Sequence, residues 1–225
     1  MNAMEQSDYL KVAAEEGWLK SATQKRSRDM CERILEAAFV VFSEKGYRDT
    51  NIVDITGLAG CSVGIFYKRF TDKEGLFFTL QHRHFSGSRA RFDMITDARD
   101  TDTTADIFRG FVNRSRKFMF ANTGFIKAQV ELALKNPKVA DARKANLVYA
   151  ADRLMQVLVS RGELPDSKEL RKKLELAVRV VFATLTHMVL FGPGPYPIKD
   201  KRVLENLTDI LVGFLHEEQD RLGIL

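Results

Sequence analysis

Apolar residues recur three and four positions apart through most of the chain, and no segment alternates apolar and polar residues for long enough to predict a half-buried strand. This spacing places apolar side chains on one face of an α-helix. The pattern therefore predicts an all-α fold. Capping residues, glycines and prolines divide it into helices at about 29–45, 52–59, 63–70, 73–97, 104–121, 123–135, 137–162, 167–191 and 200–221.

The sequence changes character near residue 98. Most of the predicted helices before this point are short and closely spaced, whereas those after it are longer. We expect a polar N-terminal arm at residues 1–28, a small helical module at 29–84 and a larger helical domain at 85–225. The arm ends in a basic run, Lys25, Arg26 and Arg28, which fits either contact with nucleic-acid phosphates or a solvated tail.

Two helix caps lie close together in the small module. Thr50 or Asn51 caps the helix that ends at Gly60, and Ser62 caps the next helix after a three-residue turn. Two short helices joined in this way are typical of the helix-turn-helix motif, whose second helix enters the major groove of DNA. The glycine supplies the backbone angles that let the two helices cross. The motif predicts that the outward face of the second helix contacts DNA.

Around this motif the sequence resembles the tetracycline-repressor family of bacterial transcription regulators. The resemblance implies an N-terminal three-helix DNA-binding domain and a C-terminal helical domain that binds a ligand and forms a dimer. It covers about a fifth of the chain. The matching positions are Arg33-Ile34-Leu35, Ala37-Ala38, the run from Phe42 to Tyr47, Thr50, Ile55, the run from Ala59 to Phe70, and Lys73 to Leu76.

Carried over residue by residue, the resemblance implies phosphate contacts from Thr50, Tyr67 and Lys73, and groove-facing residues at positions 63–65 and 68. The residue types fit these roles, because a lysine amine reaches guanine acceptors and apolar side chains contact thymine methyl groups. Spacing alone also fits core aromatic residues beside a solvated basic face. The predicted DNA-binding residues are Thr50, Asn51, Ser62, Val63, Gly64, Ile65, Tyr67, Lys68, Arg69 and Lys73.

The segment Gly60-Cys61-Ser62-Val63-Gly64 also matches the nucleophile elbow of serine hydrolases. That elbow needs a strand before the serine and a sheet to present it, whereas residues 52–59 read as a helix. We therefore expect Ser62 to cap a helix and the protein not to be an enzyme. The alternative is a helical ligand-carrying or catalytic protein that keeps the module only as a scaffold.

Cofactor chemistry finds little support in the sequence. His82 and His84 lie two positions apart, so on a helix they point about 200° apart and cannot share one metal ion. The two cysteines, Cys31 and Cys61, form neither a disulfide framework nor a metal-binding pair. We expect no metal, no cofactor and a reducing cytoplasmic location.

Charge and hydropathy limit the kinds of partner that we expect the protein to bind. Lysine and arginine number 35 against 30 acidic residues, and this net charge of +5 permits a nucleic-acid partner without requiring one. The longest apolar segment, 178–191, is interrupted by Arg179 and His187, so we expect no stretch long enough to span a membrane and no membrane partner.

The last two predicted helices carry apolar stripes whose residues lie three and four apart. In the resembled family the last two helices of each subunit pair across a dimer interface, so we expect a homodimer that reads a palindromic operator in double-stranded DNA. Packing inside one subunit is the alternative. The predicted interface residues are Leu174, Val178, Val181, Leu185, Val203, Leu207, Ile210 and Phe214.

Residues 104–191 contain many large apolar side chains and a few polar ones. Aromatic residues at helical spacing usually form a core, but an apolar cavity with a few polar groups is also the common form of a small-molecule site. By its resemblance, the protein is expected to be a repressor released from DNA by a small apolar or amphipathic effector. The predicted pocket residues are Phe111, Phe118, Phe125, Gln129, Tyr149, Phe182 and His187.

Overall fold

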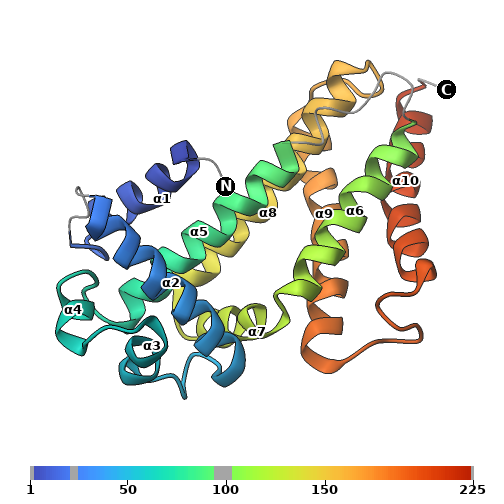
Figure 1. Ribbon diagram of the computed structural model, residues 1–225. Helices are drawn as coiled ribbons and strands as arrows, with labels where there is room; N and C mark the ends of the chain where they lie inside the picture. Colours follow the sequence, from blue (N-terminus) through green and yellow to red (C-terminus); the bar gives the residue numbers. More distant parts are fainter. Residues whose placement is uncertain (1–2, 21–24, 94–102, 224–225) are drawn as a thin grey trace. The chain divides into compact units, whose positions relative to one another are not determined.

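The computed structural model describes residues 3–20, 25–93 and 103–223 of the chain. The regular structure in these residues is α-helical, as predicted, and their one β pairing is an isolated bridge between Leu19 and Phe70. The helices (Figure 1) are α1 Ala3–Glu15, α2 Lys25–Lys45, α3 Ile52–Ala59, α4 Val63–Tyr67, α5 Lys73–Asp93, α6 Thr104–Ala121, α7 Thr123–Ala133, α8 Pro137–Ser160, α9 Lys168–Phe191 and α10 Lys201–Leu222.

The helix boundaries follow the predicted ones within a few residues after residue 29. Local capping explains this agreement. The Thr103 side chain accepts a hydrogen bond from the backbone N–H of Asp106, and the Ser167 side chain accepts one from Leu170. Gly223 ends α10 in a left-handed conformation. Two differences concern α4, which ends three residues earlier than predicted, and α5, whose predicted end at residue 97 lies outside the described residues.

The contacts divide the chain into two compact units. The first comprises residues 1–88 and 123–140, and the second comprises 89–122 and 141–225. The predicted division at 84/85 differs from this arrangement, because residues 123–140 lie in the first unit. Sequence periodicity identifies α7 as a helix but not the element against which it packs.

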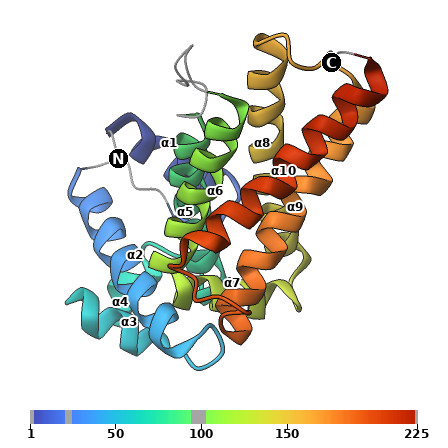
Figure 2. The same ribbon diagram turned by 90° about the vertical axis from the view of Figure 1, so that its right-hand side faces the viewer.

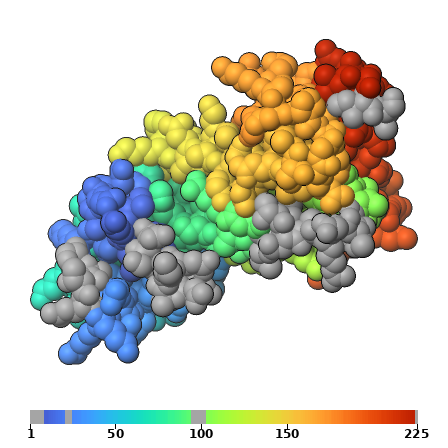
Figure 3. Space-filling view, turned by 90° about the horizontal axis from the view of Figure 1, so that it is seen from above, coloured from blue at the N-terminus to red at the C-terminus, as the bar shows by residue number. Residues whose placement is uncertain are grey.

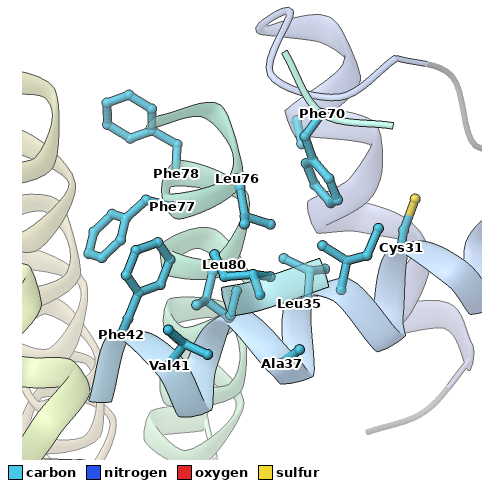
Figure 4. Close-up of a cluster of buried hydrophobic side chains, with 14 of the residues drawn as sticks. Cys31, Leu35, Ala37, Val41, Phe42, Phe70, Leu76, Phe77, Phe78 and Leu80 are labelled. Carbon is cyan, nitrogen blue, oxygen red and sulfur yellow. The ribbon is translucent and has the colours of Figure 1, made fainter. Parts of the chain in front are cut away.

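The first unit is built around α2 and α5. Figure 4 shows Leu35 and Phe42 of α2 facing Leu76 and Phe77 of α5, and all four side chains are buried. The ring of Phe77 meets Phe42 edge-on, with 5.0 Å between the ring centres. Burial of these large side chains supplies the main stabilisation of the unit.

Helix α7 packs against α2 in the same unit. Gly124 lies so close to the backbone of Ser43 that any Cβ there would collide with its carbonyl group. The carboxylate of Glu131 accepts a hydrogen bond from the backbone N–H of Tyr47 at 3.1 Å. These two contacts fix α7 against the C-terminal end of α2, where the chain turns towards α3.

The N-terminal segment is a correction to the predicted arm. Residues 3–15 form α1, and Tyr9, Leu10, Ala13 and Leu19 are buried in the core of the first unit. The hydroxyl group of Tyr9 donates a hydrogen bond to the carboxylate of Glu32. The basic run at 25–28 forms the first turn of α2 rather than part of an arm. The amphipathic patch in this segment is therefore a packing surface.

The second unit is a helical layer in which α10 packs on both α6 and α9, and α6 packs on α9 (Figure 2). The end of α10 lies beside the connection from α8 to α9, as Figure 3 shows for the red and orange segments. There the side-chain amide of Gln219 donates a hydrogen bond to the carbonyl of Glu163 at 3.4 Å.

Helix α9 is long and apolar enough to cross a membrane by length and composition alone, with a mean hydropathy of 1.7 over 18 residues. The expectation that no stretch reaches this length is therefore wrong. Packing on α6 and α10 accounts for the apolar composition of one face of α9, of which Leu174, Val178 and Leu185 are fully buried.

Candidate functional site

Helices α3 and α4 form the predicted helix-turn-helix. They are joined by residues 60–62, and Gly60 adopts φ 62°, which is the left-handed conformation that favours glycine. The guanidinium of Arg33 donates a hydrogen bond of 2.5 Å to the carbonyl of Ala59, at the end of α3. Ser62 caps α4 by accepting a hydrogen bond from the N–H of Ile65 at 3.3 Å. Ser62 thus follows a helix, and the elbow of a serine hydrolase is not present here.

The two faces of α4 differ in character. Phe66 is buried with Ile55 and Phe70 in the core of the first unit. Val63 and Tyr67, by contrast, are 38% and 43% exposed. The inner aromatic side chains hold the short helix in place, and its outer face is free to meet a partner. The predicted groove-facing and phosphate-binding residues on or beside this helix that are exposed or half-buried are Val63, Gly64, Ile65, Tyr67, Lys68 and Arg69.

Lys73 binds the backbone of its own chain, whereas the sequence predicted a contact with a DNA phosphate. Its ammonium group donates hydrogen bonds to the backbone carbonyls of Thr50 at 2.8 Å, Tyr47 at 3.0 Å and Arg48 at 3.4 Å. It also lies 4.6 Å from the centre of the Tyr47 ring. Burial lowers the pKa of Lys73. Because the three ammonium hydrogens are used within the chain, Lys73 fastens the turn between α2 and α3 rather than a DNA phosphate.

Thr50 is a second correction at this turn. It is fully buried, and its hydroxyl group donates a hydrogen bond to the carbonyl of Gly46 at 2.6 Å. Its side chain is therefore not available to phosphate. The neighbouring Asn51 is exposed and begins α3, where its N–H donates to the carboxylate of Asp54 at 3.2 Å. Asp54 also pairs with Lys45 at 2.9 Å.

Lys20 joins this surface although the sequence pattern gave no sign of it. Its ammonium group donates a hydrogen bond to the carbonyl of Tyr67 at 3.1 Å, and its N–H donates to the carbonyl of Arg69 at 2.6 Å. The carbonyl of Trp18 accepts a bond from the N–H of Thr71 at 3.2 Å. The segment after α1 therefore supports the C-terminal end of α4. No spacing rule relates residues that lie about 50 positions apart.

The predicted dimer residues divide into two groups. Six of them are buried inside the second unit, so they form its internal core rather than a surface: Leu174, Val178, Val181, Leu185, Val203 and Leu207. Ile210 is 40% exposed and Phe214 is half-buried. The apolar stripe on α9 was correct as a packing face, but the helices it meets are α6 and α10 of the same chain.

A different stripe of α9 faces outward. Leu176, Val180 and Phe191 are 61%, 42% and 75% exposed, respectively. His187 is also exposed, and its ring lies 4.9 Å from that of Phe191. The spacings between 176, 180, 187 and 191 are four or seven positions, so these residues share one face. His187 therefore belongs to this surface rather than to the internal pocket that the sequence predicted.

The remaining predicted pocket residues are not all together. Phe111 and Phe182 lie in one aromatic cluster of the second unit with Phe92, with ring centres 5.7–6.4 Å apart. Tyr149 donates its hydroxyl hydrogen to Asp93 at 2.5 Å. Phe118 stands on α6, seven positions after Phe111. Two residues are corrections, because they are buried in the first unit: Phe125 and Gln129.

The described residues offer neither a metal site nor a reactive thiol beside the helix-turn-helix. Among the described residues no group of three or more His, Cys, Asp or Glu could hold a metal ion. Cys31 is buried, and burial raises the pKa of its thiol to about 11. Cys61 is half-buried in the turn before α4, and burial raises its pKa as well. Neither thiol is activated as a nucleophile.

Comparison with known proteins finds relatives of the helix-turn-helix segment and of the fold. Residues 34–80 match the model of the bacterial regulatory proteins of the tetR family. The chain is 24% identical over 194 residues to the uncharacterized HTH-type transcriptional regulator YuxN of Bacillus subtilis (strain 168). That alignment covers 84% of this chain and 65% of YuxN, so the chain spans less than two thirds of the relative it matches.

Solved structures share the fold at low identity. Salmonella enterica GusR matches with a TM-score of 0.66 at 18% identity, over 87% of this chain and 100% of that one. The transcriptional regulator FadR of Bacillus subtilis, solved with stearoyl-CoA, matches with a TM-score of 0.63 at 18% identity, over 80% and 97% of the two chains. The TetR family transcriptional regulator PfmR of Thermus thermophilus matches with a TM-score of 0.56 at 21% identity, over 80% and 96%. The helix-turn-helix segment of this chain is thus similar to that of the tetR family of bacterial regulatory proteins, and the chain shares its helical fold with these solved regulators.

Proposed function

We propose that this protein is a cytoplasmic repressor that binds a palindromic operator as a homodimer and leaves it when a small molecule binds. The observation that carries the proposal is the two-sided character of α4. Phe66 anchors its inner face, while Val63, Tyr67 and Lys68 remain outside. A rigid helix with exposed apolar, hydroxyl and basic groups matches the chemistry of a major groove and its flanking phosphates.

The basic groups near α4 support this orientation. Lys20 lies at the C-terminal end of the helix, and Lys68 follows its last residue. A lysine at the rim of a recognition helix, as Lys20 is here, attracts phosphates without regard to sequence, so it raises affinity and makes it dependent on salt. Lys68 is assigned to the groove, where its amine can reach guanine acceptors. We assign Tyr67 and Lys68 to direct DNA contact, and Thr50 and Lys73 to holding the turn that precedes the motif.

The exposed apolar stripe of α9 supports a dimer. Leu176, Val180 and Phe191 would lose much of their contact with water against a second copy of the chain, and Ile210 of α10 adds to the same type of surface. A symmetric dimer would present two copies of α4 to DNA, and a spacing of about 34–36 Å between them would fit two half-sites on one face of the duplex. That geometry is the reason to expect a palindrome.

The aromatic cluster of the second unit supports a small-molecule effector. Large aromatic side chains from α5, α6 and α9 meet there, and FadR, one of the solved structures with this fold, holds stearoyl-CoA. An effector shifts the protein off DNA only if it binds the released state more tightly than the DNA-bound state.

Selection from random duplex DNA tests the proposal. The full-length protein is incubated with a random library, and the affinity of the enriched sequence is measured at several salt concentrations. We expect a palindrome whose affinity falls steeply with salt. Enrichment of no sequence by a folded protein would contradict DNA reading, and enrichment of a single half-site would contradict the dimer. Lys117→Ala, an exposed lysine of α6, is the matched control for any lysine substitution near α4.

A further inference from the structure

The end of helix α4 is completed by residues from a different part of the first unit. Helix α4 has five residues, and a helix this short is unstable on its own in water. The N–H of Thr71 would continue it by bonding to the carbonyl of Tyr67, four positions earlier. Instead, this N–H donates to the carbonyl of Trp18 at 3.2 Å, and the carbonyl of Tyr67 accepts a hydrogen bond from the ammonium group of Lys20 at 3.1 Å. Residues 17–20, which we call the brace, thus take the place of a further turn of α4.

Two more hydrogen bonds join the brace to the chain after α4. The N–H of Lys20 donates to the carbonyl of Arg69 at 2.6 Å. In the other direction, the hydroxyl group of Thr71 donates to the carbonyl of Gly17 at 2.7 Å. The last carbonyls of a helix have no partner inside it and need one from elsewhere. The brace supplies this partner at α4 with a positive charge, which is favourable at the C-terminal end of a helix.

The brace is itself anchored on α5. The ring of Trp18 stacks on that of Phe78, with 4.8 Å between the ring centres. Gly75 of α5 lies so close that an added Cβ would be 3.1 Å from the carbonyl oxygen of Trp18. Leu19 is buried, and it pairs with Phe70 in the isolated antiparallel bridge. Because the brace is packed this closely on α5, it holds the end of α4 in one place.

The brace lies outside the segment that matches the family model. The match begins at residue 34, so it assigns no role to residues 17–20. Tyr67 and Lys68, by contrast, lie within the match, at the end of α4 that the brace bonds. Contacts with base edges need side chains held within about 0.5 Å of the right geometry, whereas attraction to phosphates depends mainly on charge. We therefore expect the brace to affect base contacts more than phosphate contacts.

We propose that the brace is a positioning element for DNA reading, in which Lys20 caps α4, Trp18 anchors the cap, and the two fix how the outer face of α4 meets the bases. The inference rests on the proposed function, because it concerns the face of α4 that we assign to DNA. Neither residue needs to touch a base. Without the brace the end of α4 loosens, so the selected sequence loses its advantage while the general attraction to DNA remains.

Hydrogen exchange followed by mass spectrometry tests this support without DNA. In full-length Trp18→Ala, we expect the amides of residues 63–70 to exchange about tenfold or more faster than in the wild-type protein, because local opening of α4 becomes easier. The amides of α7 should change much less. If Trp18→Ala does not fold, Thr71→Val keeps the shape of its side chain and removes the bond to Gly17, and we expect about threefold faster exchange in the same segment.

Fluorescence anisotropy tests the effect on reading, with the duplex enriched from the random library and a scrambled duplex of the same composition. Trp18→Ala should lose about tenfold on the enriched duplex and about twofold or less on the scrambled one, with an unchanged salt slope. Gly124→Ala, whose added Cβ collides with the backbone of α2, is the control that should keep the preference. Lys20→Met also removes a charge, so it should in addition reduce the salt slope by about one, unlike Lys11→Met at an exposed position of α1.

The two experiments separate the ways in which the account can fail. Unchanged exchange in α4, or equal losses of Trp18→Ala on the two duplexes, would overturn the proposal. A Lys20→Met variant that lowers the salt slope but keeps the full preference would reduce Lys20 to a phosphate contact and would also overturn it. A wild-type protein that prefers no sequence would contradict the proposed function, and faster exchange in α4 of Trp18→Ala would still sustain the brace as the support of that helix.

Discussion

Two partly shielded cations, Lys73 in the first unit and Arg91 in the second, are held in opposite ways. At the turn of residues 46–50, the ammonium group of Lys73 is satisfied by three backbone carbonyls of the same unit. Arg91, by contrast, lies over the ring of Phe118, and its Nη2 has no hydrogen-bond partner among the described residues. The difference teaches that the first cation is held by backbone carbonyls, whereas the second is held by an aromatic ring.

The apolar surfaces of the same two units extend this contrast. Because Gly124 has no side chain, α7 packs directly against α2, and both sides of this contact come from the chain itself. The outward stripe of α9 leaves Leu176, Val180 and Phe191 exposed. Substitutions in the first unit should therefore change the free energy of unfolding, and substitutions at the open places of the second unit should change association. The following predictions test that distinction, beginning with the largest effect.

Val180→Asp should weaken the dimer by about a hundredfold or more, because a charge would be removed from water at the interface without a partner. The monomer should keep its stability, since Val180 is 42% exposed in the single chain. Sedimentation equilibrium over a concentration series measures the change. Lys144→Asp, an exposed position on α8, is the control that should leave the dimer intact. Equal dissociation of the two variants would show that α9 is not part of the dimer interface.

Gly124→Ala should lower the free energy of unfolding by about 3 kcal/mol, because the added methyl group collides with a backbone carbonyl that cannot move aside without shifting α2. Urea unfolding followed by circular dichroism measures it. Gly213→Ala is the matched control, because no atom lies near its Cβ position and an alanine there favours the helix. Unchanged stability of the first variant would mean that α7 does not close on α2.

Lys73→Met should cost about 2 kcal/mol of unfolding free energy, since the side chain keeps its length but leaves the carbonyls of Tyr47 and Thr50 without their donor. Lys68→Met, at an exposed position, should cost almost nothing. The same unfolding experiment compares them. If the Lys73 variant kept full stability and lost affinity for every DNA sequence, the phosphate contact implied by the family would be correct after all.

The smallest effect concerns Asp54 at the start of α3. Its bond to Lys45 and the N–H of Asn51 hold the pKa of this carboxyl below its ordinary value. A lowered pKa in the folded state contributes stability at neutral pH that is lost as the pH falls from about 4 through the folded-state pKa. Asp54→Asn should flatten the fall in melting temperature over this range. Identical pH profiles of both proteins would show that the carboxylate contributes nothing.

Much of the fold could be predicted from the sequence, because helices depend on local rules. Apolar periodicity located the helices after residue 29, and Gly60 with Ser62 located the turn of the DNA-reading motif. These signals lie within a few positions of one another along the chain. They do not depend on which element packs where.

The parts that could not be predicted depend on contacts between distant residues. Periodicity shows that α9 has an apolar face, but not that α6 and α10 of the same chain cover it. Lysines 68 and 73 look alike in the sequence, and only the fold shows that one is exposed and the other is bonded to the turn at residues 46–50. From the sequence, Phe125 likewise looks like an aromatic residue of the ligand pocket. Only the fold shows that α7, which carries it, belongs to the first unit.

The central claim is that the outer face of α4 reads DNA, and one comparison tests it most directly. Fluorescence anisotropy gives the affinities of the wild-type protein and of Lys68→Ala for the selected duplex and for a scrambled duplex of the same composition. We expect the variant to lose about tenfold on the selected duplex and much less on the scrambled one, because Lys68 is assigned to a base contact. Equal losses on the two duplexes would reduce Lys68 to a phosphate contact, and no loss on either would contradict the assignment of this face to DNA.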